Sequence, residues 1–178
     1  MDVFEAILRR RSVRTYAQKP VPKRKLEKVL EAARLAPSAV NYQPWRFIVV
    51  TDQGKREKIS DGQRWAGFLK DAPVVIVGCG DRKASPKWHV IDVTIAMQNM
   101  VMEATAEGLG TCWIGSFDEK VVKRLLKIPA QMKVVAMLTL GYPREKLDIK
   151  RQMIHLFHRR KKLEEIVDFE EYGKKSQP

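Results

Sequence analysis

Residues 88–107 constrain the fold of this 178-residue chain more than any other segment. Apolar side chains fall on most sides of a helix drawn through them, which predicts a central helix rather than an amphipathic surface helix. A β-branched run at Val74–Cys79 predicts a buried strand before it, and Val134–Leu140 predicts another strand after it. A long helix between strands indicates a mixed α/β (α+β) domain, a three-layer sandwich of helices around one small sheet.

Shorter elements fill much of the remaining chain. Asp2 is predicted to cap a first helix that ends near Arg10, and Asp118 to cap a later one. Another helix begins at Pro22 and ends before Pro37, because proline suits the first helical position and disfavours helix in the residue before it. The other predicted elements are strands at 45–51 and 111–115 and a short helix at 55–60.

The size and composition fit one soluble domain. A chain of this length can bury roughly 70% of its unfolded surface, and 44% of its residues are hydrophobic. No apolar run reaches the roughly 20 residues that a membrane-spanning helix needs. The N-terminus has no apolar signal region, so we expect a cytoplasmic protein. Cys79 and Cys112 lie in separate apolar runs and are expected to be buried thiols rather than a disulfide.

The net charge of +13 could indicate binding to nucleic acid or to another anion. The basic residues are scattered over several segments, and most have acidic neighbours. No basic run is interleaved with aromatic residues, the pattern that suits single-stranded nucleic acid. We therefore expect a solvated basic surface and no nucleic-acid or membrane partner.

Two polar segments near the N-terminus are candidates for a binding site. Residues 10–14, Arg-Arg-Ser-Val-Arg, place three guanidinium groups and a hydroxyl within five residues, which suits a phosphate. By spacing alone they could also be the basic end of a helix. Residues 36–45 form a loop, because Pro37 and Pro44 each disfavour helix in the residue before them. This loop could line a flat ring with its serine, asparagine and glutamine, or it could be an ordinary loop.

Together with three later segments, these two resemble the FMN-dependent nitroreductase family. The later segments are a helix with Gln98-Asn99 that ends at Gly108-Leu109-Gly110, the strand Thr111–Gly115, and a stretch from Gly141-Tyr142-Pro143 to Arg159–Ile166. The resemblance covers nearly the whole chain. It implies a nitroreductase-like fold with a small, mixed and mostly antiparallel sheet, and a homodimer with FMN at its interface.

In this family the basic run grips the FMN phosphate and the ribityl chain. The resemblance therefore implies that Arg10, Arg11 and Ser12 bind the phosphate region. Arg14 would face N1 and the C2 carbonyl of the flavin, where a fixed cation stabilises negative charge on the reduced ring. No side chain is assigned a catalytic role, because the flavin carries the chemistry and Arg14 tunes it.

The resemblance implies three further sets of cofactor contacts. They are Pro37, Ser38 and Asn41 against the ring bound by the other subunit, the backbone of Trp113, Ile114 and Gly115 near N5 and O4, and Arg160 or, second, Arg159 on the phosphate. Gln63 is a weaker candidate for the pyrimidine edge. The chain departs from the family pattern at Lys162, where a proline is common. It also departs at Ile114-Gly115, where some relatives carry Glu-Gly, so the acceptor stays open.

The implied function is an FMN-dependent oxidoreductase. It would take hydride from NADH or NADPH and reduce a nitroaromatic, a quinone or a flavin in a ping-pong cycle. No G-x-G-x-x-G follows a strand, so the nicotinamide is expected to dock transiently over the flavin. The alternatives are another flavin activity, such as reductive dehalogenation or conversion of FMN to dimethylbenzimidazole, and a non-enzymatic flavin-binding or nucleic-acid-binding protein.

Other catalytic chemistries lack their residue sets. Ser12 and Ser38 have no adjacent histidine base, and His155 and His158 have no further ligands to complete a metal site.

We expect residues 1–178 to form one domain. Its last part, residues 144–178, is a C-terminal extension too sparse in apolar residues for a core of its own, and it is expected to pack on the partner subunit.

Overall fold

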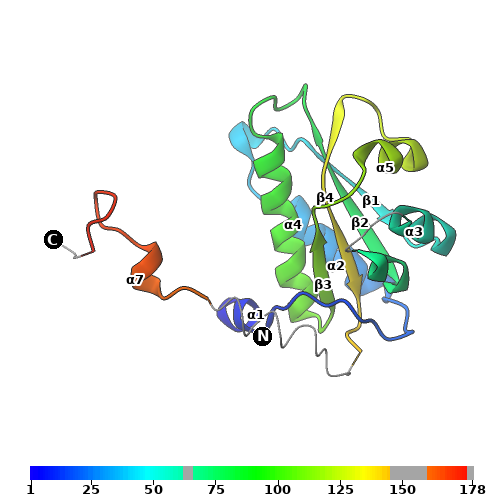
Figure 1. Ribbon diagram of the computed structural model, residues 1–178, viewed down its shortest axis with the longest axis horizontal. Helices are drawn as coiled ribbons and strands as arrows, with labels where there is room; N and C mark the ends of the chain where they lie inside the picture. The colour runs from blue at the N-terminus through cyan, green and yellow to red at the C-terminus, as the bar shows by residue number, and fades with distance from the viewer. Residues whose placement is uncertain (62–65, 145–159, 176–178) are drawn as a thin grey trace. The chain divides into compact units, whose positions relative to one another are not determined.

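A computed structural model of the protein describes residues 1–61, 66–144 and 160–175. The chain divides into two units, Met1–Arg144 and Glu145–Pro178, and each is described by itself. The first unit holds the sheet and the helices that pack on it (Figure 1). No helix among these residues is both long enough and apolar enough to cross a membrane.

Four antiparallel strands form the sheet, in the order β1-β2-β4-β3 (Figure 1). They are β1 (Trp45–Val50), β2 (Val74–Asp81), β3 (Gly110–Ile114) and β4 (Met132–Gly141). The central strands β2 and β4 are buried along most of their length, as their apolar composition predicts. All four predicted strands are present, and the only parallel contact in the described chain is a bridge between Ser12 and Thr111.

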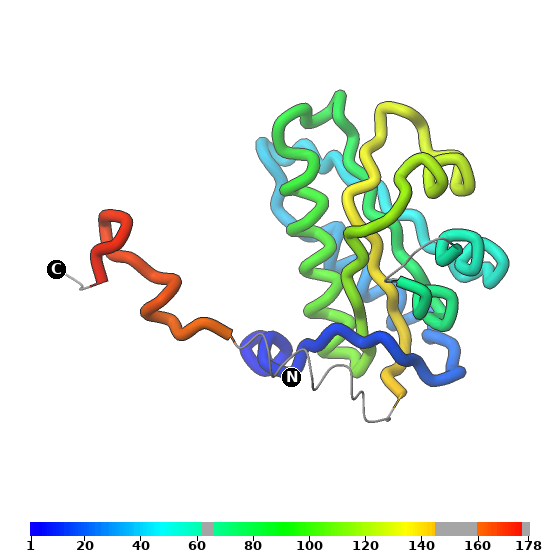
Figure 2. The backbone as a smooth tube through the Cα atoms, viewed as in Figure 1, coloured from blue at the N-terminus to red at the C-terminus, as the bar shows by residue number. Residues whose placement is uncertain are grey.

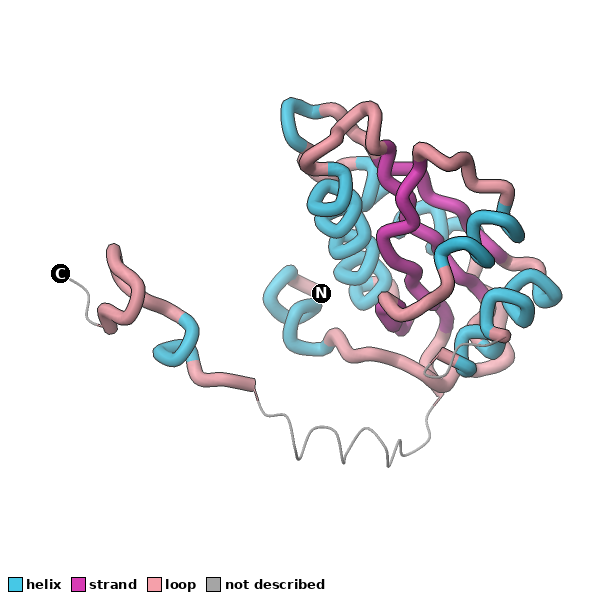
Figure 3. Tube along the Cα trace, turned by 45° about the horizontal axis from the view of Figure 1, so that its top comes forward, coloured by secondary structure: helices cyan, strands magenta, loops and turns pink. Residues whose placement is uncertain are grey.

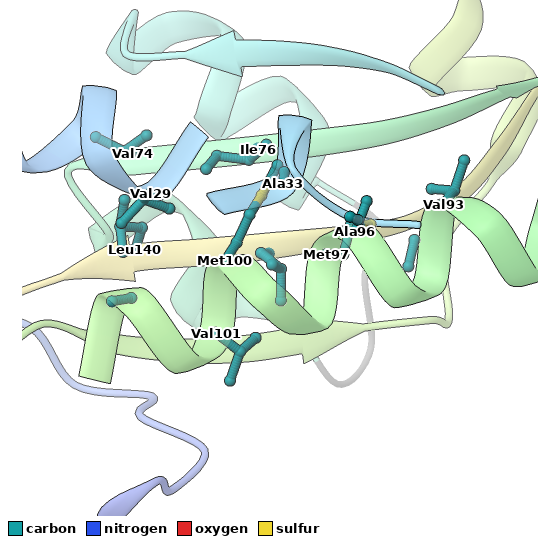
Figure 4. Close-up of a cluster of buried hydrophobic side chains, with 14 of the residues drawn as sticks. Val29, Ala33, Val74, Ile76, Val93, Ala96, Met97, Met100, Val101 and Leu140 are labelled. Carbon is teal, nitrogen blue, oxygen red and sulfur yellow. The ribbon is translucent and has the colours of Figure 1, made fainter. Parts of the chain in front are cut away.

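Helices cover both faces of the sheet (Figure 3). On one face, α2 (Lys23–Arg34) and α4 (His89–Ala106) join the strands in a hydrophobic cluster. Figure 4 shows Met97 and Met100 on the side of α4 that meets this cluster, and both side chains are fully buried. These two helices and the sheet form two of the three predicted layers.

The third layer lies on the opposite face. It consists of α3 (Gln53–Ser60), the 3₁₀ segment η2 (Gly67–Asp71) and α5 (Glu119–Leu126), which pack on the sheet in a second cluster. As predicted, Asp118 caps α5, where its carboxylate accepts hydrogen bonds from the N–H groups of Lys120 and Val121 at 2.8 and 3.2 Å.

The central helix α4 lies very close to the sheet. A Cβ atom at Gly78 of β2 would lie 2.3 Å from the sulfur of Met97. The β2–β4 register also shifts between Gly78 and Cys79. Glycine therefore permits the close approach of the strand to the helix, because a side chain here would force the Met97 side chain to move.

The outward side of α4 differs from the expectation of a helix enclosed on most sides. Val93 and Met100 are fully buried, but Ile91 and Ile95 are 49% and 37% exposed. The first helix, α1 (Val3–Arg9), is capped by Asp2 as predicted and also leaves apolar side chains exposed. Within one chain, the described elements leave these apolar faces uncovered.

Within the described part of the second unit, residues 160–175, there is one short helix, α7 (Leu163–Ile166). Its first turn is closed by a hydrogen bond from the N–H of Lys162 to the carboxylate of Glu165 at 3.0 Å. Leu163 and Ile166 are both exposed. The packing of this extension on a partner subunit stays a prediction.

Candidate functional site

The basic segment runs beside the start of β3. The N–H of Val13 donates to the carbonyl oxygen of Thr111 at 2.8 Å, next to the bridge from Ser12. Val13 is buried, and a Cβ atom at Gly110 would lie 2.5 Å from its Cγ2. Glycine at this position therefore permits the close approach of the two segments. Figure 2 shows the segment, in dark blue, crossing the ends of β3 and β4.

A pocket of about 170 Å³ lies where this segment meets β3. It is lined by Arg14, by Ala66 and Phe68 at the start of η2, and by Cys112, Trp113, Ile114, Gly115 and Ser116. Arg14 and the stretch 113–115 are predicted site residues that the fold brings together. The sequence carries no binding signal for Phe68, which lies in a short apolar run, and it suggests only a buried thiol for Cys112.

The guanidinium groups of the basic segment are not neutralised by carboxylates within the described residues. Arg10 is half-buried, while Arg11 and Arg14 are exposed. None of the three forms a salt bridge in this part of the chain, whereas the preceding Arg9 pairs with Glu5 at 2.5 Å. Cations of this kind beside a pocket favour an anionic ligand, because guanidinium groups bind phosphate through charge-assisted hydrogen bonds.

Ser12 connects the basic segment to the pocket wall, although it does not itself line the pocket. Burial raises the pKa of the Cys112 thiol, while the charge of Arg14 and a hydrogen bond with the Ser12 side chain offset part of that rise. Arg14 and Ser12 therefore both lower the pKa of the same thiol in the pocket wall. Cys112 is a neutral, buried group at neutral pH rather than a reactive thiolate.

The predicted loop at residues 37–43 lies at a different place in the chain. It contains the 3₁₀ turn η1 (Ala39–Asn41), and it does not line the pocket described above. The N–H of Ala39 donates to the carboxylate of Asp92, which is buried in the first turn of α4, at 3.1 Å. The Ser38 hydroxyl accepts a hydrogen bond from the N–H of Gln43 at 2.9 Å. The loop is thus anchored to α4.

The backbone of this loop is strained, and the side chains of residues 40–43 are exposed. Val40, Asn41 and Gln43 have φ angles of 48°, 55° and 48°, in a region that disfavours L-residues with a side chain. Val40 is 84% exposed. Strain of this kind is retained where surrounding contacts enforce it, and it occurs often at ligand-binding sites.

The last predicted contacts belong to the second unit or lie outside the described residues. Arg160 is exposed in the second unit. Arg159 and Gln63 fall outside the described ranges. The cofactor-binding roles of all the predicted site residues stay predictions: Arg10, Arg11, Ser12, Arg14, Pro37, Ser38, Asn41, Trp113, Ile114, Gly115, Arg159 and Arg160.

Comparison with known proteins identifies relatives of the whole first unit. The model of the Nitroreductase family matches residues 7–64 and 60–142. The chain is 40% identical over 151 residues to a protein of Methanothermobacter thermautotrophicus named "Putative NADH dehydrogenase/NAD(P)H nitroreductase", covering 82% of this chain and 79% of that protein.

Solved structures extend the similarity to the fold. An FMN-dependent nitroreductase from Clostridium difficile R20291 is 32% identical with a TM-score of 0.76, covering 83% of this chain and 96% of that one. A nitroreductase family protein from Clostridium difficile 630 is 31% identical with a TM-score of 0.82, covering 96% and 99% of the two chains.

Proposed function

Because this chain belongs to the nitroreductase family, we propose that it is an FMN-dependent NAD(P)H oxidoreductase. The family match and the antiparallel sheet confirm the predicted membership and fold. The observation that supports the proposal is that Arg14 and the end of β3 line one pocket, since the family resemblance implies that both contact the cofactor.

The residues around the pocket fit a ligand with a phosphate and a flat ring. The cations of residues 10–14 have no carboxylate partner among the described residues, so an incoming phosphate would meet no competing anion there. Phe68 and Trp113 supply apolar surface that suits a ring. A Cβ atom at Gly115 would meet nothing within 4 Å, so the backbone is open to a ligand at that point.

Each proposed contact has a distinct role. Arg10, Arg11 and Ser12 would hold the phosphate region, with Arg160 as a second cation. Arg14 would stabilise negative charge at the pyrimidine edge of the ring. When bound, FMN would supply the hydride-transfer chemistry. The electron donor would be NADH or NADPH, and the acceptor a nitroaromatic, a quinone or a flavin, in a ping-pong cycle.

We further propose that the working form is a homodimer. A second copy would cover the exposed apolar residues of α1 and α4. Large exposed apolar patches often mark protein–protein interfaces. The strained loop with Pro37, Ser38 and Asn41 would then contact the flavin of the partner subunit. The C-terminal extension would pack across the same interface.

Cofactor identification tests this proposal directly. The purified protein is denatured, and the released flavin is identified by chromatography; FMN is expected, whereas FAD or a failure to bind added FMN would overturn the assignment. A steady-state screen of NADH and NADPH against quinones, nitroaromatics and free FMN then defines donor and acceptor. Flavin-loaded protein that oxidises neither nucleotide would contradict the enzymatic part of the proposal.

A further inference from the structure

Two buried hydroxyl groups connect the segments that form the pocket. The Tyr16 hydroxyl donates to the carbonyl oxygen of Val13 at 2.6 Å, and its oxygen lies 2.6 Å from Oγ1 of Thr139 in β4. Tyr16 is 3% exposed and Thr139 is fully buried. The tyrosine hydroxyl donates its only proton to Val13. The threonine hydroxyl is therefore the donor in the hydrogen bond between the two hydroxyls.

The same threonine also reaches the strand that lines the pocket. Thr139 lies opposite Cys112 in the β3–β4 ladder, and its Oγ1 is 3.4 Å from the Cys112 carbonyl oxygen, a long second contact for the one threonine proton that is directed mainly at Tyr16. The Cys112 carbonyl belongs to the peptide that leads to Trp113, and the Val13 carbonyl belongs to the peptide that leads to Arg14. The hydroxyl pair therefore touches the backbone immediately before two residues of the pocket.

The Tyr16 ring reinforces this connection by packing. Tyr16 forms a buried cluster with Val13 and Ala72, and Phe68 of the pocket packs against that cluster. Burial raises the pKa of the Tyr16 phenol well above its ordinary value, so the group stays a neutral hydrogen-bond donor at any working pH. A fixed donor in a close-packed setting leaves the Val13–Arg14 peptide little freedom to move.

We propose that Tyr16 is a positioning residue for the cofactor site, acting through Arg14. Its hydroxyl holds the peptide before Arg14 against β4, and so fixes the guanidinium relative to the β3 wall. The inference rests on the proposed function, because it is the bound FMN that Arg14 would meet. The sequence carries no signal for this role, since Tyr16 and Thr139 are far apart in the chain.

The test uses the full-length protein and removes single hydroxyl groups. Tyr16→Phe is compared with Tyr142→Phe, because Tyr142 does not line the pocket and its ring, which lies beneath Lys19 and Lys25, is kept in phenylalanine. Thr139→Val is compared with Thr139→Ser, which keeps the hydroxyl. For each protein we would measure FMN affinity, the midpoint potential of bound FMN, and resistance to urea.

We expect Tyr16→Phe and Thr139→Val to weaken FMN binding by about threefold to tenfold, the effect of losing one hydrogen bond. Both should lower the flavin potential, in the same direction as Arg14→Ala, because a displaced cation stabilises the reduced ring less. Thr139→Ser and Tyr142→Phe should retain the wild-type potential. In the double variant Tyr16→Phe/Arg14→Ala, the potential should equal that of Arg14→Ala alone.

The outcomes separate this inference from the proposed function. If wild-type protein binds no FMN, the proposed function fails and the inference fails with it. If wild type binds FMN and Arg14→Ala lowers the potential, but Tyr16→Phe changes only urea resistance, then Tyr16 is purely structural and the inference alone is overturned. Additive shifts in the double variant would likewise show that Tyr16 does not act through Arg14. If Tyr16→Phe does not fold, Thr139→Val gives the same readouts with the phenol retained.

Discussion

The basic segment of residues 10–16 and the loop of residues 37–43 are both predicted parts of the site, yet they are held in opposite ways. The first is bound to the sheet by a hydrogen bond from the N–H of Val13 to the backbone of β3, and by a hydrogen bond between the hydroxyls of Tyr16 and Thr139 of β4. The second is anchored at one end to Asp92 and directs strained residues such as Val40 outward.

This difference supports our proposal that one chain completes only one wall of the site. The segment forms its wall by ordinary packing and hydrogen bonding, at no cost in backbone strain among residues 10–16. The loop keeps left-handed backbone at non-glycine residues, which costs free energy, and such strain is common where a surface binds a ligand or a partner. In our proposal, the flavin bound by a second copy of the chain contacts this exposed loop.

The largest expected effect comes from removing a cation of the fixed segment. Arg10→Ala should weaken FMN binding by roughly ten- to a hundredfold, because it removes charge-assisted hydrogen bonds to the phosphate. Fluorescence titration of FMN measures the change. Arg160→Ala should have a similar effect if the extension supplies the second cation.

Lys55→Ala is the matched control for these variants, since Lys55 is an exposed cation on α3. It should bind FMN as wild type does. Equal losses in the Arg10, Arg160 and Lys55 variants would mean that net charge, rather than a built site, attracts the ligand.

The anchor of the loop gives the next largest effect. Asp92→Ala should lower the free energy of unfolding by about 1–2 kcal/mol, because it leaves the N–H of Ala39 and the hydroxyl of Ser85 without their acceptor. Asp92→Asn keeps an acceptor oxygen for Ala39 and should recover part of this loss. Urea denaturation measures both, and identical curves for wild type and Asp92→Ala would show that the loop is not held by this carboxylate.

A third variant tests whether a loss of FMN affinity can result simply from lower stability of the first unit. Burial raises the pKa of Glu119, but hydrogen bonds from Lys133, Lys123 and the N–H of Val134 outweigh it and lower the pKa to about 2. Glu119→Gln should lower the free energy of unfolding at neutral pH by about 1 kcal/mol. It should leave FMN affinity unchanged, unlike Arg10→Ala.

The pH dependence of this variant follows from the direction of the shift. Because the folded-state pKa lies below the unfolded value, the contribution of Glu119 is fully present above about pH 4.5 and is lost as the pH falls toward about 2. The stability difference between wild type and Glu119→Gln should therefore shrink over that window. A difference that stays constant down to pH 2 would contradict this account.

The smallest expected effect is a gain in stability at the strained loop. Val40→Asn should raise the free energy of unfolding by about 0.5–1 kcal/mol, because asparagine tolerates the left-handed backbone better than a β-branched residue. Val121→Asn is the control, as Val121 is also an exposed valine but lies in α5. A loss of stability at Val40 would show that its side chain makes a stabilising contact that outweighs the strain.

Much of the fold could be predicted from the sequence because its signals are local. The caps Asp2 and Asp118, the proline before α2 and the β-branched runs of β2 and β4 each act within a few residues of the element they define. The observed ends therefore differ only slightly from the expected ones. The short turns η1 and η2 were not predicted, because neither has a cap or a periodic pattern that would mark it.

The candidate site was predictable only in part. Arg14 and the stretch 113–115 were identified through the family resemblance, and the fold brings them together. Phe68 was missed because an aromatic residue in a short apolar run is most often part of a core. Tyr16 and Thr139 were missed because a tyrosine or threonine in sequence does not reveal its hydrogen-bond partner.

The sequence by itself determined the identity of the elements, the family and the residue types available for a phosphate and a ring. These depend on side-chain chemistry and on short-range backbone preferences, which act within one turn or one strand. Only the tertiary structure decided that residues 10–16 lie against β3 and that the loop does not line this pocket. Such contacts join distant parts of the chain, and their free energy depends on burial and close packing that exist only after the whole unit has folded.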